Sequence, residues 1–461
     1  MSEEREFCSK FEKECTALRS KKVMLYGTGE KTKFLLENVR GFHFEGILDP
    51  QLENEYIFNT KVYPIQEAAI RKCSIIIVAR DHIVNIIFAR IQEFCNRNEI
   101  DVYDVHGNKL PYAGDRGISS DIKYWGTGVS DIRKTIAKYD IISFDIFDTL
   151  IQRTTLTLAD MFQLMEVQGM VPRGFAKYRI GAERECQCQG IYNISDIYHK
   201  IAQSSGWKDE RLQKYCAAEL SMEKRILQPR KHMAALLQWA VDIGKKIYLV
   251  SDMYWMKDII IQLLRGMGIS NYQQILVSCE EHKSKKSGEL FQELKKIVKS
   301  DHIIHIGDNR IDDIRMAEKC GLDTIQIMSA YELLMLSDMQ GFLNSIHTFQ
   351  DRIVLGMIMA KLFSDPFSLN KHKGRVYLDN RDAFIYCFLS PIIYNKKLHV
   401  EDQLLLAVYN EFLEDFERLY GIRNGEELSP EFENALTNWM TVHDDRITLE
   451  MKKLLLQIQK L

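Results

Sequence analysis

The sequence predicts an α/β protein with two modules built on parallel sheets, followed by a helical C-terminal region. Two series of short Ile-, Leu- and Val-rich runs, each bounded by polar residues and alternating with helical patterns, indicate buried parallel strands. A long segment with helical spacing interrupts the second series, and from about residue 332 apolar residues recur at i, i+3, i+4 and i+7. Because 461 residues exceed what one core holds, we expect about three domains.

The first series spans residues 1–115 and has the order of a nucleotide-binding, Rossmann-like unit: strand, glycine turn, helix. Its strands are expected at residues 23–26, 44–50, 73–81 and 101–105. Gly27 and Gly29 form the turn, and Asp49 follows them by about 20 residues, where such units place the acid that holds a ribose. These three are candidate cofactor-binding residues. Because Thr32 occupies the place of the third glycine, a purely structural module is the alternative.

After a linker at residues 116–138, the second series predicts the main sheet, within residues 139–331. Its strands are expected at residues 140–145, 246–251, 274–278, 302–308 and 322–328. A helical segment at about 152–241 separates the first strand from the second. Such a segment does not fit within a parallel sheet, so we expect it over one end of the strands. Residues 332–461 are predicted to be helical, apart from one possible strand at 374–378.

Composition and charge exclude several classes of function. The net charge is −3, with 61 basic against 64 acidic residues, so no global field attracts nucleic acid or an anionic membrane. No uncharged apolar stretch approaches the ~18 residues of a membrane span, and the first residues lack the pattern of a signal peptide. The ten cysteines include no Cys-x-x-Cys pair, so we expect reduced thiols in a cytoplasmic protein.

Polar clusters follow the predicted strands of the second module at their carboxyl ends, where open α/β sheets place active sites. They comprise Asp145, Phe147, Asp148, Thr149, Ser251, the run Lys283 to Lys286, Asp308, Asp312 and Asp313. A carboxylate can attack phosphorus and form a covalent intermediate, provided that a divalent ion neutralises the reacting groups. A hydroxyl and a lysine can hold the phosphoryl oxygens. Magnesium suits such a site, because it needs only one or two carboxylates.

The order Asp-x-x-x-Thr-Leu, a strand-terminal Ser, Lys before a Gly-x-Leu-Phe helix, and Gly-Asp-Asn-x-x-x-Asp resembles the four motifs of the haloacid dehalogenase (HAD) superfamily. The resemblance covers about residues 139–330. It implies a Rossmann-like HAD core in which the segment at 152–241 is a helical cap, inserted after the first strand and closing over the substrate. The layout, with a smaller Rossmann-like domain before the core and a helical tail, is similar to large bacterial HAD proteins often encoded near surface-polysaccharide genes.

This resemblance implies a metal site for Mg²⁺. Asp145 would be both the nucleophile and a metal ligand, and the further ligands would be Asp308, Asp313 and the backbone carbonyl of Phe147. Asp312 competes with Asp313 for the last position. The carboxylates of Asp145 and Asp308 should then lie roughly 3–5 Å apart, close enough to repel each other without a cation.

The resemblance also implies how the substrate is held. Ser251 would bind a phosphoryl oxygen, Thr149 would order the loop, and Lys285 would neutralise the nucleophile and the phosphate. Lys285 lies six residues before Phe291, the offset usual in the superfamily, and Lys286 is its competitor. The implied activity is that of a phosphatase or phosphotransferase with an aspartyl-phosphate intermediate, acting on a small phosphorylated metabolite such as a sugar or polyol phosphate.

One position departs from the phosphatase pattern. Phosphatases of this superfamily carry a second Asp two residues after the nucleophile, which protonates the leaving oxygen. Phe147 stands there, and the next acid is Asp148. General acids contribute ~10²–10⁴-fold in rate. Either Asp148 takes over, or another acid such as His282 or a cap carboxylate does, or the leaving group needs no proton.

Two other functions stay open. Haloacid dehalogenases lack the second acid too, so a HAD-fold enzyme with non-phosphate, dehalogenase-like chemistry is one alternative. The other is a non-catalytic protein that binds ligands and partners, although the presence of both Asp145 and Asp308 counts against it. A protein partner, or self-association through the C-terminal helices, is a further expectation.

Overall fold

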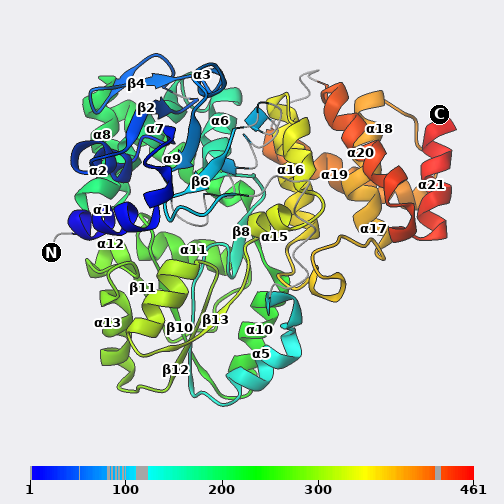
Figure 1. Ribbon diagram of the computed structural model, residues 1–461. Helices are drawn as coiled ribbons and strands as arrows, with labels where there is room; N and C mark the ends of the chain where they lie inside the picture. Colours follow the sequence, from blue (N-terminus) through cyan, green and yellow to red (C-terminus); the bar gives the residue numbers. More distant parts are fainter. Residues whose placement is uncertain are drawn as a thin grey trace. The chain divides into compact units, whose positions relative to one another are not determined.

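Figure 1 shows the computed structural model of the chain, which describes residues 3–50, 52–79, 84, 87–88, 91, 94–95, 98, 100–110, 123–420 and 427–460. The chain divides into two compact units, Met1–Ser119 and Ser120–Leu461. The expected linker at 116–138 falls partly outside the described residues. Its described part is folded rather than extended: Tyr124 and Trp125 are buried in the core of the second unit, and α5 (Val129–Ile136) follows.

The first unit contains a six-stranded sheet in the order β3-β4-β2-β1-β5-β6, parallel except for the β3–β4 pair. Its strands are β1 (Lys22–Tyr26), β2 (His43–Leu48), β3 (Tyr56–Ile57), β4 (Thr60–Tyr63), β5 (Ser74–Ile77) and β6 (Val102–Asp104). Its described helices are α1 (Glu3–Glu14), η1 (Thr16–Leu18), α2 (Glu30–Asn38) and α3 (Gln66–Ile70). The four predicted strands are present, although residues 80–81 lie outside the described part. The sequence pattern did not indicate the β3–β4 hairpin.

The second unit contains a five-stranded, fully parallel sheet in the order β11-β10-β7-β12-β13. Its strands are β7 (Ile141–Phe144), β10 (Lys246–Ser251), β11 (Gln274–Val277), β12 (Ile303–Gly307) and β13 (Asp323–Gln326). All five lie at predicted positions, so the prediction of an α/β protein with parallel sheets is confirmed. Because the strands run in one direction, the residues that follow β7, β10 and β12 meet at one edge of the sheet.

Helices cover both faces of this sheet. The covering helices are α10 (Lys231–Asp242), α11 (Lys257–Gly266), α12 (Ser278–Glu281), α13 (Glu289–Val298), the π-helical turn η3 (Arg310–Arg315) and α14 (Met316–Lys319). Ile141 of β7 belongs to a cluster with residues of α13 and α14, whereas its neighbour Ile142 belongs to a separate, larger cluster that includes residues of α5, α10 and α11. This alternation is what a strand buried on both faces requires.

The helical insert lies between the paired strands β8 (Ile151–Arg153) and β9 (Leu227–Pro229). It consists of α6 (Leu158–Val167), α7 (Phe175–Gln189), α8 (Ile194–Ser205) and α9 (Asp209–Ile226). The predicted segment 152–241 also included α10, but α10 packs against β10 and α5 of the core. At the start of α8, the Ile194 N–H donates to the carbonyl of Tyr254 at 2.9 Å. The insert therefore contacts the loop that follows β10.

The C-terminal region is helical. Its elements are α15 (Ala330–Leu336), η4 (Gln340–Ser345), α16 (Phe349–Leu362), η5 (Asn370–His372), α17 (Arg381–Phe384), η6 (Ile385–Leu389), α18 (Ser390–Lys396), α19 (Gln403–Tyr420), α20 (Pro430–Val442), η7 (Asp444–Arg446) and α21 (Leu449–Lys460). The prediction of a possible strand at 374–378 is wrong: within this range only Leu378 forms a β-bridge, with Ile447. One hydrophobic cluster joins the sheet, the insert and this region, so 332–461 packs as part of the second unit.

None of the helices formed by the described residues combines the length and the apolar character that a membrane span requires.

Candidate functional site

Asp145 and Asp308 lie at the same edge of the sheet of the second unit. Asp145 follows β7, and Asp308 follows the adjacent strand β12. The Asp145 N–H donates to the carbonyl of Ile306 at 2.9 Å, which extends the strand pairing by one residue. Gly307 makes room beside them, because a Cβ at this position would lie 2.5 Å from the Cβ of Asp313. The glycine thus allows the side chain of Asp313 to lie directly against the strand end.

Lys285 joins two of the acids. Its Nζ donates to Asp145 Oδ1 at 2.6 Å and to Asp313 Oδ1 at 2.5 Å, and the residue is only 5% exposed. The backbone at this point is fixed by Asp252, whose Oδ1 and Oδ2 accept from the Lys285 N–H at 2.8 and 3.0 Å. The side chain of Lys286 is exposed. Of the two candidate lysines, the geometry therefore favours Lys285.

Asp313 is fully buried and ends a chain of polar side chains. Ser143 Oγ lies 2.7 Å from His305 Nδ1, and His305 Nε2 lies 3.2 Å from Asp313 Oδ1. The neighbouring acid, Asp312, instead accepts from the side-chain amide of Asn309 at 3.2 Å. Of the two candidate acids, the geometry favours Asp313.

Burial and the mutual repulsion of the carboxylates set the charge states of the cluster. Burial raises the pKa of Asp145 to about 7, against the opposing charge of Lys285. Burial, with the charges of Asp145 and Asp148, raises the pKa of Asp308 well above its usual range. Burial also acts to raise the pKa of Asp313, but Lys285 and His305 together outweigh it and hold the value at about 2. Burial alone would lower the pKa of Lys285, yet Asp145 and Asp313 hold it well above the ordinary value.

The donor set of this cluster fits a divalent cation. One carboxylate oxygen from each of Asp145, Asp308 and Asp313 can be chosen so that all lie within 4.8 Å of one another. The Thr149 hydroxyl donates to Asp308 Oδ1 at 3.4 Å. When all three carboxylates are ionised, the ammonium group of Lys285 leaves two negative charges, which one divalent cation would balance. Carboxylate oxygens are the ligands that magnesium prefers.

Asp148 lies in a strained turn of the loop after β7. Its φ is +59°, in the left-handed region, and its N–H donates to the carbonyl of Ile151 at 2.7 Å. Its carbonyl accepts from Arg230 Nη1 at 2.5 Å. Arg230 is fully buried and also donates to the carbonyls of Phe363 and Ser364 in the C-terminal region. Through Arg230, the loop after β7 is linked to the C-terminal region.

The side chain of Phe147 has no acidic group, and its ring packs against the guanidinium group of Arg153. The guanidinium carbon of Arg153 lies 5.0 Å from the centroid of the Phe147 ring. Ser251 is the last residue of β10, next to β7 in the sheet, and is 2% exposed. The structure thus brings Ser251 to the same sheet edge as Asp145, as predicted from the strand order.

Three residues that organise the site were not among the predicted site residues. Asp252 could have been found from the sequence, because it directly follows the candidate residue Ser251 at the end of a predicted strand. His305 lies within β12, where a histidine is more often structural than catalytic, and the structure places it against Asp313. Arg230 carried no local signal, because its carbonyl partners lie 82 and more than 130 residues away along the chain.

In the first unit, the predicted cofactor residues come together around the glycine turn. The Thr28 hydroxyl donates to Asp49 Oδ2 at 2.8 Å. Gly27 has a φ of +112°, and a Cβ there would lie 3.0 Å from the carbonyl oxygen of Val78, so glycine is required. A Cβ at Gly29 would meet nothing within 4 Å. Thr32, at the third glycine position, is buried and donates to the carbonyl of Gly27 at 2.7 Å.

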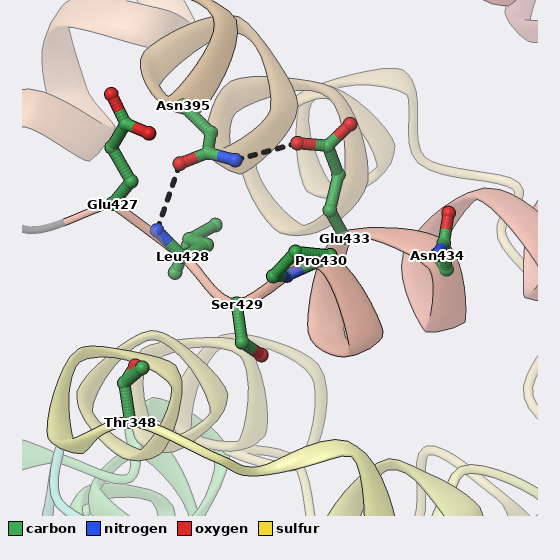
Figure 2. A pocket seen from close by; sticks show the side chains of 8 residues that line it. All are labelled: Thr348, Asn395, Glu427, Leu428, Ser429, Pro430, Glu433 and Asn434. Carbon is green, nitrogen blue, oxygen red and sulfur yellow. Dashed lines mark hydrogen bonds between the residues drawn. The ribbon is translucent and has the colours of Figure 1, made fainter.

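A pocket of about 430 Å³ lies in the C-terminal region, between α18 and the start of α20 (Figure 2). It is lined by Thr348, Asn395, Glu427, Leu428, Ser429, Pro430, Glu433 and Asn434. Asn395 bridges its walls, accepting from the Leu428 N–H and donating to Glu433 (Figure 2). Lys396 and Lys397 pair with Glu433 and Glu427. None of the predicted site residues lines this pocket.

No model of a known protein family matches the chain, and no curated protein matches it. Three solved structures illustrate what it resembles. The HAD-hydrolase YfnB from Bacillus subtilis bound to magnesium is 19% identical, and the match covers 41% of this chain and 88% of that one with a TM-score of 0.31. A predicted phosphoglycolate phosphatase from Haemophilus somnus is 13% identical, and the match covers 41% of this chain and 85% of that one with a TM-score of 0.31. The 2-haloacid dehalogenase from Pseudomonas syringae pv. Tomato is 15% identical, and the match covers 41% of this chain and 86% of that one with a TM-score of 0.30.

These structural neighbours are HAD-superfamily hydrolases, and they include both phosphatases and dehalogenases. Each similarity covers about two fifths of the chain. At these identities and TM-scores the likeness does not distinguish one activity from the other.

Proposed function

We propose that the chain is a magnesium-dependent HAD-type hydrolase, a phosphatase or phosphotransferase acting on a small phosphorylated metabolite. The observation that carries this proposal is the buried cluster in which Lys285 contacts Asp145 and Asp313, with Asp308 beside them. It joins a carboxylate, a fixed positive charge and a set of cation ligands at one sheet edge, which is the combination that phosphoryl transfer to a carboxylate requires.

In this proposal Asp145 is the nucleophile. One of its carboxylate oxygens forms a bond to phosphorus as the bond to the ester oxygen breaks, and the leaving oxygen takes a proton to become an alcohol. Water then attacks the aspartyl phosphate, which releases inorganic phosphate and restores the carboxylate. An acceptor alcohol in place of water would make the reaction a phosphotransfer. Lys285 neutralises the charge that Asp145 and the phosphoryl group bring together.

Asp145, Asp308, Asp313 and the backbone carbonyl of Phe147 are the residues proposed to hold magnesium. A bound magnesium ion would supply positive charge that neutralises the phosphate dianion. The protein contributes the fixed positions: Thr149 contacts Asp308, and Lys285 and His305 hold Asp313. Ser251, at the end of β10, is proposed to donate to a phosphoryl oxygen.

A dehalogenase-like reaction is the second candidate, because Phe147 stands where a phosphatase has its general acid. In that reaction Asp145 would attack carbon, a halide would leave without a proton, and water would hydrolyse the resulting ester. The acid cluster supports the phosphoryl reaction better, because displacement at a neutral carbon needs no divalent cation.

A panel of phosphate esters and 2-haloacids, assayed with and without magnesium, tests this proposal. We expect phosphate release that requires magnesium and disappears in Asp145→Asn, a near-isosteric change. The control variant is Asp312→Asn, which alters the neighbouring acid outside the cluster and should leave activity largely intact. Halide release without phosphate release would replace the proposal by its alternative. Turnover in Asp145→Asn at the wild-type rate would remove the nucleophile assignment.

A further inference from the structure

Arg230 lies between β9 and α10 and is fully buried, although it carries a positive charge. Within the described part of the chain, its guanidinium group donates only to backbone carbonyls. Nη1 donates to Asp148 at 2.5 Å, Nε to Ser364 at 3.1 Å and Nη2 to Phe363 at 3.4 Å. This one side chain therefore joins the loop after β7 to the residues that follow α16.

The environment of Arg230 differs from that of the other fully buried arginine, Arg179. Arg179 donates to both carboxylate oxygens of Glu219, at 2.9 and 2.7 Å. Burial acts to lower the pKa of Arg179, but the charges around it, chiefly that of Glu219, outweigh burial and hold the pKa well above its ordinary value. For Arg230, burial lowers the pKa, and the nearby acids, which include Asp148 and Asp308, offset this only in part.

Holding a cation in this position is unfavourable, because carbonyl partners replace neither its lost hydration nor a carboxylate. The carboxyl end of α16 offsets part of the cost, since the end of a helix carries a partial negative charge. Arg230 could therefore be a cap of α16 and nothing more. Its third bond, to the carbonyl of Asp148, points to a second role, because that carbonyl belongs to the loop that carries Asp145.

Two hydrogen bonds fix the peptide groups on either side of Asp148. Its N–H donates to the carbonyl of Ile151 at 2.7 Å, and its own carbonyl accepts from Arg230. The peptide group between Phe147 and Asp148 is planar and trans, so the Phe147 carbonyl points opposite to the Asp148 N–H. A residue other than glycine has little conformational freedom at a φ of +59°. The two bonds therefore set the direction of the Phe147 carbonyl.

We propose that Arg230 is a positioning residue of the magnesium site: it holds the turn at Asp148 so that the Phe147 carbonyl points toward the ion. This inference rests on the proposed function, in which that carbonyl is a metal ligand. It also gives the residues after α16 a part in the site, because they hold the other side of the guanidinium group.

The direction of the change in magnesium affinity separates positioning from charge. The charge of Asp308 acts on the pKa of Arg230, so the guanidinium group lies within electrostatic reach of the proposed metal ligands. A positive charge there repels a cation, so removal of the charge alone would tighten magnesium binding. Loss of the positioning bond would weaken it. Loss of a helix cap would lower the stability of the protein and leave the affinity of the folded protein unchanged.

Arg230→Gln is the variant that tests the proposal, and Gln228→Met is the matched control. Gln228 donates to the carbonyl of Ala360 in α16 at 3.2 Å, so its loss affects the same helix end without the bond to Asp148. Isothermal titration calorimetry with magnesium chloride measures the affinity, at a temperature where thermal unfolding shows each protein to be folded. We expect Arg230→Gln to weaken magnesium binding by about tenfold or more, as changes behind metal ligands do. Gln228→Met should bind magnesium as the wild type does.

Arg230→Lys is a second variant, which keeps the charge and decides the question if Arg230→Gln does not fold. Lysine lacks the planar fork that reaches carbonyls on two sides, so we expect magnesium binding to be weakened severalfold. In both Arg230 variants, a higher magnesium concentration should restore most of the lost turnover of p-nitrophenyl phosphate, because the bond to Asp148 acts through the metal site.

The outcomes distinguish this inference from the proposed function. Unchanged or tighter magnesium binding in Arg230→Gln, or wild-type affinity in Arg230→Lys, would overturn the positioning role. An equal weakening in Gln228→Met would assign the effect to the end of α16 and overturn it as well. In each of these cases the proposed function stands, provided that the wild type hydrolyses p-nitrophenyl phosphate with magnesium. A wild type that neither binds magnesium nor releases phosphate would end both proposals.

Discussion

Lys285 and Lys286 are adjacent in sequence and lie in opposite environments. Lys285 is buried between Asp145 and Asp313, and the side chain of Lys286 is exposed. We predict that Lys285→Met lowers phosphatase turnover by at least about 10²-fold, since it removes the fixed charge beside the nucleophile. Lys286→Met should change turnover little. Steady-state kinetics of both variants, with circular dichroism to verify folding, makes the comparison. Equal effects of the two changes would contradict the assignment of Lys285.

By the resemblance to the HAD motifs, Phe147 aligns with the position from which phosphatases of that superfamily donate a proton. We predict that Phe147→Asp raises the turnover of alkyl phosphates by about tenfold or more, because general acids contribute ~10²–10⁴-fold. Aryl phosphates, which leave without a proton, should gain much less. Phe147→Asn is the matched control, because it is similar in size and polarity to Asp and supplies no proton. A gain of the same size in Phe147→Asn would mean that removal of the ring, and not a new acid, causes the effect.

Asp148 is the alternative proton donor, and its backbone conformation makes a clean test possible. Asn tolerates the left-handed region as well as Asp does, so Asp148→Asn removes the acid without straining the turn. If Asp148 only shapes the loop, we expect the rates of a series of phosphate esters to depend on the leaving group equally steeply in the wild type and the variant. A flat dependence in the wild type that becomes steep in Asp148→Asn would identify Asp148 as the acid.

At this scale the sequence predicts the proposed reacting groups better than the residues that hold them in place. The resemblance to the HAD motifs singled out Lys285 through its offset from Phe291, which is visible because the lysine and the helix are close in sequence. Asp252 and Arg230 were not identified, since their partners are backbone groups brought close only by the tertiary fold. Which of Asp312 and Asp313 faces Lys285 depends on the π-helical turn η3, whose geometry is not visible in the residue pattern.

At the scale of elements, helix α16 packs closely against the start of the insert. A Cβ on Gly356 of α16 would lie 2.6 Å from the carbonyl oxygen of Thr154 and 3.0 Å from the Leu156 nitrogen, both backbone atoms. We predict that Gly356→Ala destabilises the second unit by about 1–3 kcal/mol, although alanine is the better helix former. Gly181→Ala in α7 is the control, because a Cβ there meets nothing within 4 Å; it should stabilise by roughly 0.5–1 kcal/mol.

Urea unfolding measures both glycine variants. Opposite signs for Gly356→Ala and Gly181→Ala are expected, since the same substitution meets backbone in one helix and open space in the other. Stabilisation by Gly356→Ala would show that α16 does not approach the insert as closely as described.

The long apolar strands were predictable and the short paired ones were not. Runs such as residues 246–251 are buried on both faces, so their composition alone marks them. β8 and β9 are three residues each, and their pairing across the whole insert carries no local pattern. For that reason the sequence placed the end of the insert after α10 instead of before β9.

At the scale of the whole molecule, the division into two units predicts which truncated chains fold. A chain starting at Ser120 should fold and keep magnesium-dependent activity, because the second unit contains every residue of the proposed catalytic cluster. A chain ending after residue 331 should not fold, since the hydrophobic core continues into the C-terminal helices and Arg230 would lose two of its carbonyl partners. Circular dichroism and the phosphatase assay of both truncations make the test. A folded, active chain ending at 331 would show that residues 332–461 form a separate domain.

The central claim is that Asp145 becomes covalently phosphorylated during turnover. The direct measurement is an acid quench during turnover of a radiolabelled phosphate ester with magnesium, followed by determination of the label bound to protein. An acyl phosphate survives acid and is cleaved by hydroxylamine, which identifies the bond. We predict label on the wild type that hydroxylamine releases, and none on Asp145→Asn. Rapid phosphate release with no labelled protein, or equal label on Asp145→Asn, would contradict the account.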